Sequence, residues 1–250
     1  MPERVLVAVA HGSVDPRASA TIAELAVVAR ERAPGLDLRT AFLGHAPPTL
    51  GQVLSTIAAD RAVTVLPLLL TAAYHSKADI PRMLARTRML ARTRGPRVSY
   101  GATLGPHPLL LRALERRLAE ADPGVGQNPG QTAVVLAAAG SSDPEANAII
   151  ARLAAQWQAR TGWFAVRQAY ASAAEPSPAA AVADLLRAGA PRVVVATYLL
   201  APGLFADRIR QSTVAAGAAA VSSALGSCVE VADVLLERFA ETRSTRRTAA

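Results

Sequence analysis

The chain has 250 residues, of which 51% are apolar and 18% charged, and its formal net charge is +8. This length suffices for one large domain or two small ones, each with a hydrophobic core, and the apolar content excludes gross disorder. The longest mostly apolar run, residues 193–206, is 14 residues long and contains Pro202 and Gly203, so it is too short and too broken to cross a bilayer.

The first copy of an alternating pattern fills residues 5–121. In chain order, the sequence predicts strand 5–10, helix 16–33, strand 36–42, helix 49–60, strand 63–70, helix 80–94, strand 97–100 and helix 108–121. The first and third strands are apolar almost throughout, as expected for strands buried on both faces of a parallel sheet. Asp15-Pro16 and His107-Pro108 are typical of helix starts, with a cap followed by a first-turn proline.

The same unit recurs in the second half of the chain. Residues 11–19 are echoed by residues 139–147 at an offset of 128, and residues 63–70 by residues 193–200 at an offset of 130. We therefore predict an α/β protein with two similar domains, 1–122 and 132–242, each a small parallel sheet flanked by helices. A turn-rich segment, 122–131, joins them, and residues 243–250 form a basic flexible tail.

The charge and the single cysteine set limits on partners and compartment. All basic residues except Lys77 are arginine, and the positive net charge favours anionic partners. Aromatic residues make up only 4% of the chain and no nucleic-acid-binding motif is present, so we expect an acidic small molecule rather than nucleic acid. Cys228 permits no internal disulfide and the first residues do not resemble a signal peptide, which favours the cytoplasm.

The four histidines all lie in the first copy. His11, His45, His75 and His107 each follow a predicted strand by a few residues. In open α/β sheets ligands bind beyond the carboxyl ends of the strands, so the four imidazoles are expected along one edge. Each histidine alone could equally be a loop or capping residue.

The second copy has lost its imidazoles. His11 corresponds to Ala139, His45 to Ala173, and His75 to Leu204 or Phe205, depending on where a gap is placed. We therefore predict that the first domain carries the active site and that the second is mainly scaffold.

Imidazoles can accept protons near neutral pH and can bind borderline transition metals. Gly12 lets the backbone approach a ligand closely, and Ser13 could bind a ligand oxygen or cap the next helix. Asp15 is interpreted chiefly as the helix cap, because its counterpart Asp143 persists in the copy without histidines. No G-x-S-x-G, P-loop, G-x-G-x-x-G or H-E-x-x-H motif is present.

A basic segment follows His75. Between Asp79 and Arg97 there is no acidic residue, and Lys77 precedes a run of arginines that begins at Arg82. The segment is either a solvated helix face or an electrostatic collar for a polycarboxylate, in which Lys77 and Arg82 lie nearest the site.

Three segments together resemble the class II tetrapyrrole chelatases, and most closely the two-domain sirohydrochlorin cobalto- and ferrochelatases. They are His11-Gly-Ser-x-Asp-Pro-Arg, the segment from Pro67 through His75-Ser-Lys-Ala-Asp-Ile-Pro81, and Leu104-Gly-Pro-His107-Pro. The resemblance covers essentially the whole chain, including the degenerate second half.

The resemblance implies insertion of a divalent metal, Co²⁺ or Fe²⁺ and possibly Ni²⁺, into sirohydrochlorin in sirohaem or cobalamin biosynthesis, without an organic cofactor. It assigns His11 and His75 as catalytic metal ligands and proton acceptors. Sirohydrochlorin carries eight carboxylates, which the basic residues of the chain could bind. Ser13, Lys77, Arg82 and His107 are then candidate substrate contacts, and we expect a monomer.

One departure concerns the second strand. Related chelatases often have Glu in a Phe-Leu-Glu context, where this chain has Phe42-Leu43-Gly44-His45. His45 either serves as a third metal ligand or proton acceptor or only lines the rim.

A non-catalytic tetrapyrrole or metal carrier is the alternative function. A hydrolase or phosphotransferase with His11 as nucleophile is a second alternative, weakened because Ala10 rather than Arg precedes His11.

Overall fold

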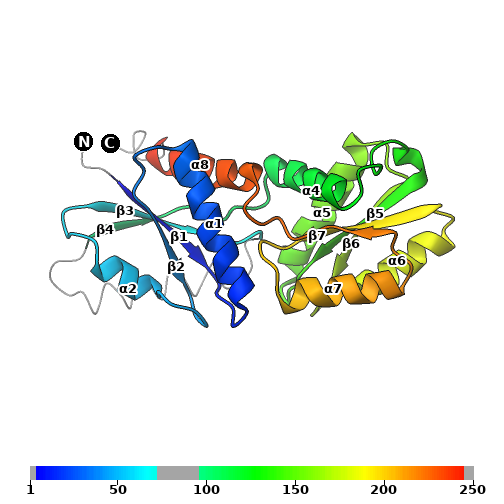
Figure 1. The fold of residues 1–250 in the computed structure, drawn as a ribbon, viewed down its shortest axis with the longest axis horizontal. Coiled ribbons are helices and arrows are strands. Elements are labelled where there is room, and N and C mark those ends of the chain that lie inside the picture. Colours follow the sequence, from blue (N-terminus) through cyan, green and yellow to red (C-terminus); the bar gives the residue numbers. More distant parts are fainter. Residues whose placement is uncertain (1–3, 72–95, 245–250) are drawn as a thin grey trace. The chain divides into compact units, whose positions relative to one another are not determined.

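The computed structural model describes residues 4–71 and 96–244. Within this part, two four-stranded parallel sheets are each flanked by helices, which confirms the predicted α/β fold (Figure 1). The strands are β1 (Val5–Ala10), β2 (Leu38–Phe42), β3 (Ala62–Pro67), β4 (Arg97–Tyr100), β5 (Thr132–Ala138), β6 (Ala165–Tyr170), β7 (Arg192–Tyr198) and β8 (Ala220–Val221). The helices are α1 (Pro16–Arg32), α2 (Leu50–Ser55), α4 (Pro108–Ala121), α5 (Pro144–Arg160), α6 (Pro178–Arg187), α7 (Leu204–Ala215), α8 (Val229–Ser244) and the short 3-10 helix η1 (Pro129–Gln131). The predicted helix 80–94 lies outside the described residues.

The first sheet has the strand order β2-β1-β3-β4, with β1 in the interior. All six residues of β1 are buried, as its continuous apolar run predicts for a strand covered on both faces. One face packs against α2, where Val5, Val7 and Val9 form a core with Leu50 and Val53. Helices α1 and α8 pack against each other on the opposite face.

The second sheet repeats this plan in the order β6-β5-β7-β8. Helices α4 and α5 cover one face, and α6 and α7 cover the other (Figure 1). The two sheets therefore share strand order and direction, as expected for a duplicated unit.

Most predicted elements have the expected bounds, and the main exception is α2. The helix predicted over 49–60 begins at Leu50, with Thr49 and Gln52 forming a capping box, but ends at Ser55. The hydroxyls of Ser55 and Thr56 donate to the carbonyls of Gln52 and Val53, at 2.8 and 2.7 Å. Such bonds compete with continuation of a helix, so α2 stops early.

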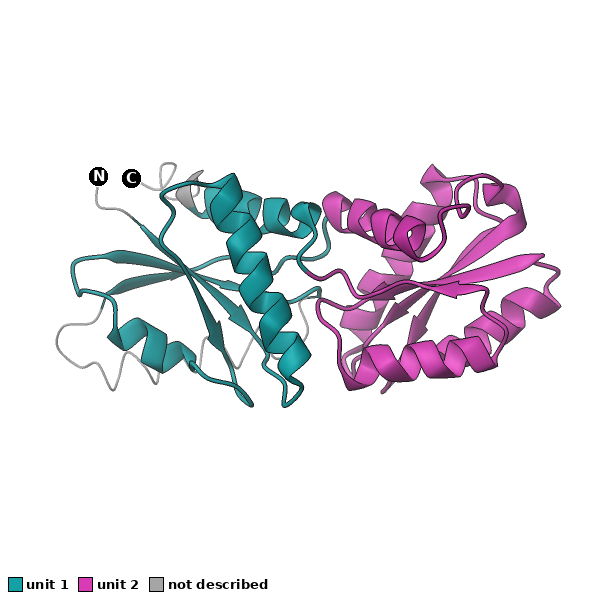
Figure 2. Ribbon diagram, in the orientation of Figure 1, with its two compact units in different colours: residues 1–107, 227–250 teal, residues 108–226 magenta. Residues whose placement is uncertain are grey.

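The compact units of the structure differ from the two sequence repeats. One unit consists of residues 1–107 together with 227–250, and the other of residues 108–226 (Figure 2). Helix α4 belongs to the first repeat but packs on β7 and β8, whereas α8 belongs to the second repeat but packs on α1 and β3. Each sheet is thus completed by the last helix of the other repeat. We call residues 1–107 with 227–250 unit 1, and residues 108–226 unit 2.

Helices α4 and α8, which we call the exchanged helices, are each held to their sheet by an arginine at an equivalent position. In unit 2, Arg117 of α4 donates to the carbonyl of Leu225 at 3.1 and 3.0 Å and pairs with Glu120. In unit 1, Arg238 of α8 donates to the carbonyls of Leu104 and Pro106, at 3.4 and 3.1 Å, and pairs with Glu241. These contacts tie each helix to the loop after the last strand of its sheet.

Helix α8 continues to Ser244, two residues into the segment predicted as a flexible tail. No helix in the described ranges has the length and apolar character needed to cross a membrane.

Candidate functional site

The site is built at the carboxyl edge of the first sheet. Strands β1 and β2 are parallel neighbours, and Ala10 is in register with Phe42 at their ends. Residues that follow the two strands therefore emerge side by side at the same edge, which is where an open α/β sheet binds ligands. His11 follows β1 directly, and His45 lies three residues beyond β2.

The structure brings His11 and His45 together. Their ring centroids are 6.4 Å apart, the rings are inclined by 49°, and both residues are exposed. The amide of Gly44 donates to the carbonyl of His11 at 3.2 Å, and the amide of Leu43 to that of Ala10 at 3.0 Å. These bonds continue the β1–β2 pairing beyond the strands and hold the two histidine-bearing loops side by side.

Two exposed imidazoles at this spacing can share one cation after modest side-chain rotation, because metal–nitrogen bonds in proteins are about 2.0–2.1 Å long. Among the described residues no group of three or more His, Cys, Asp and Glu side chains could hold a metal ion. By itself the pair could therefore supply two ligands. His75, predicted as a catalytic ligand, and Lys77 and Arg82, predicted as substrate contacts, lie outside the described residues.

Ser13 and Asp15 form the turn that starts α1. The amide of Asp15 donates to the Ser13 hydroxyl at 3.1 Å, and Asp15 caps the helix by accepting from the amide of Arg17 at 2.9 Å. Ser141 and Asp143 make the same two bonds in unit 2, at 3.0 and 2.9 Å. The predicted cap at Asp15 is confirmed. The bonds to the Arg17 side chain and amide also lower the pKa of Asp15, so it remains ionised near neutral pH.

His107 is engaged elsewhere. Its Nε2 lies 3.1 Å from a carboxylate oxygen of Glu237 in α8, and only 15% of its side chain is exposed. It immediately precedes α4, as predicted for a residue at a helix start. His107 therefore helps to hold α8 in place through Glu237, and it is also a candidate substrate contact.

Sequence reasoning missed Glu237 and Arg238. They lie about 130 residues beyond the segment that they contact, because α8 packs on the sheet of the other repeat. A signal was present, since Arg117-Leu-Ala-Glu120 is echoed by Arg238-Phe-Ala-Glu241 at an offset of 121, the offset that also relates Leu104-Gly105 to Leu225-Gly226.

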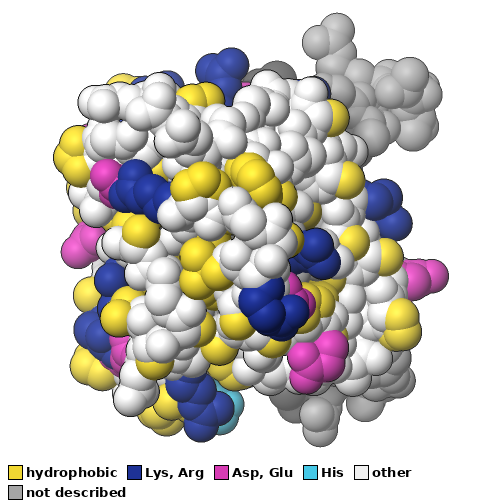
Figure 3. Space-filling view, turned by 90° about the vertical axis from the view of Figure 1, so that its right-hand side faces the viewer, with side chains coloured by type: hydrophobic (Ala, Val, Ile, Leu, Met, Phe, Trp, Pro, Cys, Tyr) yellow, Lys and Arg dark blue, Asp and Glu magenta, His cyan; other side chains and the backbone are white. Residues whose placement is uncertain are grey.

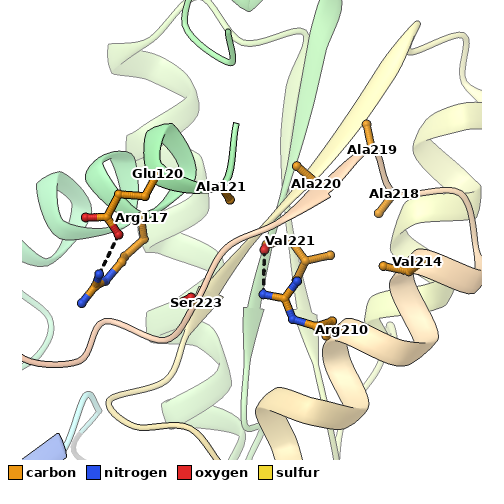
Figure 4. A pocket seen from close by; sticks show the side chains of 10 residues that line it. All are labelled: Arg117, Glu120, Ala121, Arg210, Val214, Ala218, Ala219, Ala220, Val221 and Ser223. Carbon is orange, nitrogen blue, oxygen red and sulfur yellow. Dashed lines mark hydrogen bonds and ion pairs between the residues drawn. The ribbon is translucent and has the colours of Figure 1, made fainter. Parts of the chain in front are cut away.

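A hollow of about 440 Å³ lies on unit 2, beside the short strand β8 (Figure 4). Arg117 and Glu120 of α4 line one side and Arg210 of α7 the other, and Arg210 donates to the carbonyl of Val221 at 2.9 Å. No predicted site residue lines this hollow. We therefore place the candidate chemistry at the histidine pair and not at this hollow.

Figure 3 shows one face of the molecule, on which arginine side chains are scattered among apolar and small residues and partly stand beside acidic ones. On the described part of this face they form no continuous basic patch.

The sequence model of the family described as CbiX matches residues 5–121 and again residues 133–242. The chain belongs to the CbiX family. Both repeats match, so this CbiX-family protein carries the family unit twice, in agreement with the internal duplication.

Characterised relatives agree with this membership. The sirohydrochlorin cobaltochelatase of Priestia megaterium is 28% identical over 207 residues, which cover 81% of this chain and 66% of that protein, just under two thirds of its length. The sirohydrochlorin ferrochelatase of Bacillus subtilis is 27% identical over 184 residues, which cover 72% of this chain and 68% of that protein. The solved structure of SirB from Bacillus subtilis with Fe³⁺ superposes with a TM-score of 0.82 over 98% of both chains at 24% identity, which shows the shared fold.

Proposed function

We propose that this CbiX-family protein inserts a divalent metal, Co²⁺ or Fe²⁺, into sirohydrochlorin, with Ni²⁺ as a further candidate ion. The observation that carries the proposal is the imidazole pair at the carboxyl edge of the first sheet, in a chain whose family model matches both repeats. The similarity to sirohydrochlorin cobalto- and ferrochelatases supports the substrate and the two metals. The product would serve sirohaem or cobalamin synthesis.

The reaction balances without an organic cofactor. The metal ion replaces the two pyrrole N–H protons of the macrocycle, so one M²⁺ enters and two protons leave. The site must therefore present the ion and accept protons, and neutral imidazoles can do both. We assign His11 and His75 as catalytic ligands and proton acceptors and His45 as a third such group. His45 occupies the edge beside His11, which supports a ligand role over a rim position.

We propose Ser13, Lys77, Arg82 and His107 as substrate contacts. A polycarboxylate macrocycle favours cations at the rim of its site, which supports Lys77 and Arg82. The hydroxyl of Ser13 and the ring of His107 already have partners in Asp15 and Glu237, so contact with substrate would add to these bonds or replace them. We further propose that the enzyme works as a monomer, because each sheet is completed by a helix of the same chain. We also propose a cytoplasmic location, since Cys228 is the single cysteine of the sequence and permits no internal disulfide.

His11→Ala, His45→Ala and His75→Ala test the assignment in an anaerobic optical assay of metal insertion, with Co²⁺, Fe²⁺ and Ni²⁺ in parallel. We expect each of His11→Ala and His75→Ala to lose about 100-fold or more in kcat, as is usual for loss of a proton-transfer group, and His45→Ala to lose less. Ala139→Ser, at the position equivalent to His11 in unit 2, is the control and should keep wild-type rates. Unchanged rates in the first two folded variants would contradict the assignment.

A carrier remains the alternative function, because the same pair would also suit a protein that only binds metal or tetrapyrrole. The assay separates the two, since a carrier would change the spectrum once per chain and then stop.

A further inference from the structure

The backbone around the imidazole pair is repeated in the unit that has no imidazoles. Gly12 has φ +90° and Gly140 has φ +85°, while the non-glycine residues His45 and Ala173 have φ 61° and 60°. The amide of Gly44 donates to the carbonyl of His11 at 3.2 Å, and the amide of Ser172 donates to the carbonyl of Ala139 at 3.0 Å. The two loops thus have the same conformation and the same bond in both units.

A close backbone approach sets this arrangement. A Cβ atom at Gly12 would lie 1.7 Å from the carbonyl oxygen of Gly44, where ordinary contacts begin at 3.4 Å, and one at Gly140 would lie 1.9 Å from the carbonyl oxygen of Ser172. The neighbouring atom is backbone in both cases, so no side-chain rotation can relieve the overlap. Only a residue without a side chain allows the loop after β2 to lie against the turn after β1.

We infer that Gly12 is a positioning residue of the imidazole pair and that unit 2 keeps the same backbone arrangement without the imidazoles. This inference rests on the proposed role of His11 and His45 as metal ligands. Gly12 touches the residue immediately before His45 and immediately follows His11, so it controls the separation of the two rings through the backbone. The left-handed conformation of His45 then directs its ring back towards His11, to a centroid separation of 6.4 Å.

Alanine at position 12 must push the two loops apart. The Cβ of an alanine would start 1.7 Å from the Gly44 carbonyl oxygen, and this separation has to open beyond 3.0 Å. We expect that displacement to reach His45, which follows Gly44 directly. Alanine at position 140 causes the same local strain in unit 2, where Ala139 and Ala173 stand in place of the histidines. The chain therefore contains its own matched control, with equal backbone damage and no ligand to misplace.

The first test is titration of the full-length metal-free protein with Co²⁺, followed by the visible absorption of the bound ion. We expect Gly12→Ala to weaken Co²⁺ binding by about 10-fold to 100-fold, as for loss of groups that orient metal ligands. It should also change the absorption spectrum, which a purely structural role would not do. Gly140→Ala should bind with wild-type affinity and spectrum. Equal affinities in all three folded proteins, or equal losses in both variants, would overturn the inference.

The second test remains decisive if Gly12→Ala does not fold. In a His11→Ala, His45→Ala background we add Ala139→His and Ala173→His, which place two imidazoles on the unit 2 scaffold. We expect Co²⁺ affinity to rise about tenfold above the background, since a pair of ligands on one preorganised backbone binds better than either alone. Adding Gly140→Ala to this variant should remove the gain. No gain from the two added histidines would show that the scaffold of unit 2 is not equivalent.

These tests use Co²⁺ without tetrapyrrole, so they are independent of catalysis. A wild-type protein that binds Co²⁺ in this way but never turns over sirohydrochlorin would contradict the proposed function and leave the role of Gly12 intact.

Discussion

At the scale of residues, the chemistry depends on which side chain stands beside His11. The resemblance to chelatases implies a glutamate after the second strand, whereas this chain has Gly44 and His45, and the structure sets His45 against His11. Imidazole is a softer ligand than carboxylate and suits Co²⁺, Ni²⁺ and Fe²⁺ better than it suits Mn²⁺ or Mg²⁺. The identity of residue 45 should therefore influence metal choice.

His45→Glu tests this influence. We expect the ratio of Co²⁺ affinity to Mn²⁺ affinity to fall by about tenfold, because a carboxylate favours the harder ion. Calorimetric titration of the wild-type and variant proteins with both ions measures the ratio. His107→Gln is the comparison, since His107 faces Glu237 and should leave the ratio unchanged. An unchanged ratio in His45→Glu would assign His45 to the rim.

Asp37 allows a test of electrostatic stabilisation, because its single carboxylate lies near two arginines. It bonds Arg39 at 3.0 Å and lies 3.5 Å from Arg61, and its hydrogen bond to Arg39 lowers the pKa of its carboxyl group. A group whose pKa is lowered in the folded state stabilises the protein above the pKa of the unfolded chain. That stabilisation is lost as the pH falls through the folded-state pKa.

Asp37→Asn should reduce the free energy of unfolding by about 1 kcal/mol at pH 7, as for a partly exposed ion pair. The difference from wild type should shrink as the pH falls below about 4 and disappear once the pH is below the lowered pKa of the wild-type carboxyl group. Urea unfolding at several pH values measures this, with the exposed Asp60→Asn as the control. A difference that does not shrink as the pH falls would show that the effect is not electrostatic.

At the scale of elements, the exchange of α4 and α8 decides which parts of the chain fold together. Unit 1 obtains α8 from the far end of the chain, and Val231, Ala232, Val234 and Leu235 of this helix are buried. Burial of side chains of this size contributes about 1–3 kcal/mol each, so the core of unit 1 depends on residues outside the first repeat. We therefore expect each compact unit, rather than each sequence repeat, to fold as one body.

Deletion of residues 227–250 should therefore unfold unit 1 and spare unit 2. Both tryptophans, Trp157 and Trp163, lie in unit 2, and buried Trp157 donates to Glu115 of α4 at 3.0 Å. We expect native tryptophan emission together with loss of helical circular dichroism and of protection against hydrogen exchange in residues 4–71. Deletion of residues 245–250 alone is the control and should change neither signal. A truncated chain with a protected β1 would contradict the exchange.

The sequence predicted most elements because their signals are local. The apolar run of β1 and the Asp15-Pro16 start of α1 each specify their element without reference to the rest of the chain. The duplication was predicted from the constant offset between similar segments. The edge that carries the site was predicted from the histidines that follow the strand ends. Which sheet each repeat's last helix covers was not predictable in this way, since the apolar face of a helix does not by itself specify the sheet that it packs on. The pairing of His107 with Glu237 was missed for the same reason.

At the scale of the whole molecule, the two repeats share one fold and differ in the side chains at the carboxyl edge of their sheets. Both keep the Gly-Ser-x-Asp-Pro turn and the loop conformation after their second strand, but only the first has imidazoles there. The positive net charge of +8 suits a substrate with many carboxylates. These features agree with the proposal that unit 1 carries the active site, because unit 2 has no imidazole pair.

The most direct test of the account is the number of metallated tetrapyrroles that one protein chain produces. Purified protein is mixed anaerobically with sirohydrochlorin and with Co²⁺ or Fe²⁺, each in about 50-fold excess over the protein chain, so that repeated turnover can be told from stoichiometric binding. The metallated product is followed by its absorption. We predict continued formation of metallated product well beyond one equivalent per chain, at a rate that falls by about 100-fold or more in His11→Ala. A spectral change that stops at one equivalent, or a rate no faster than that without protein, would contradict catalysis.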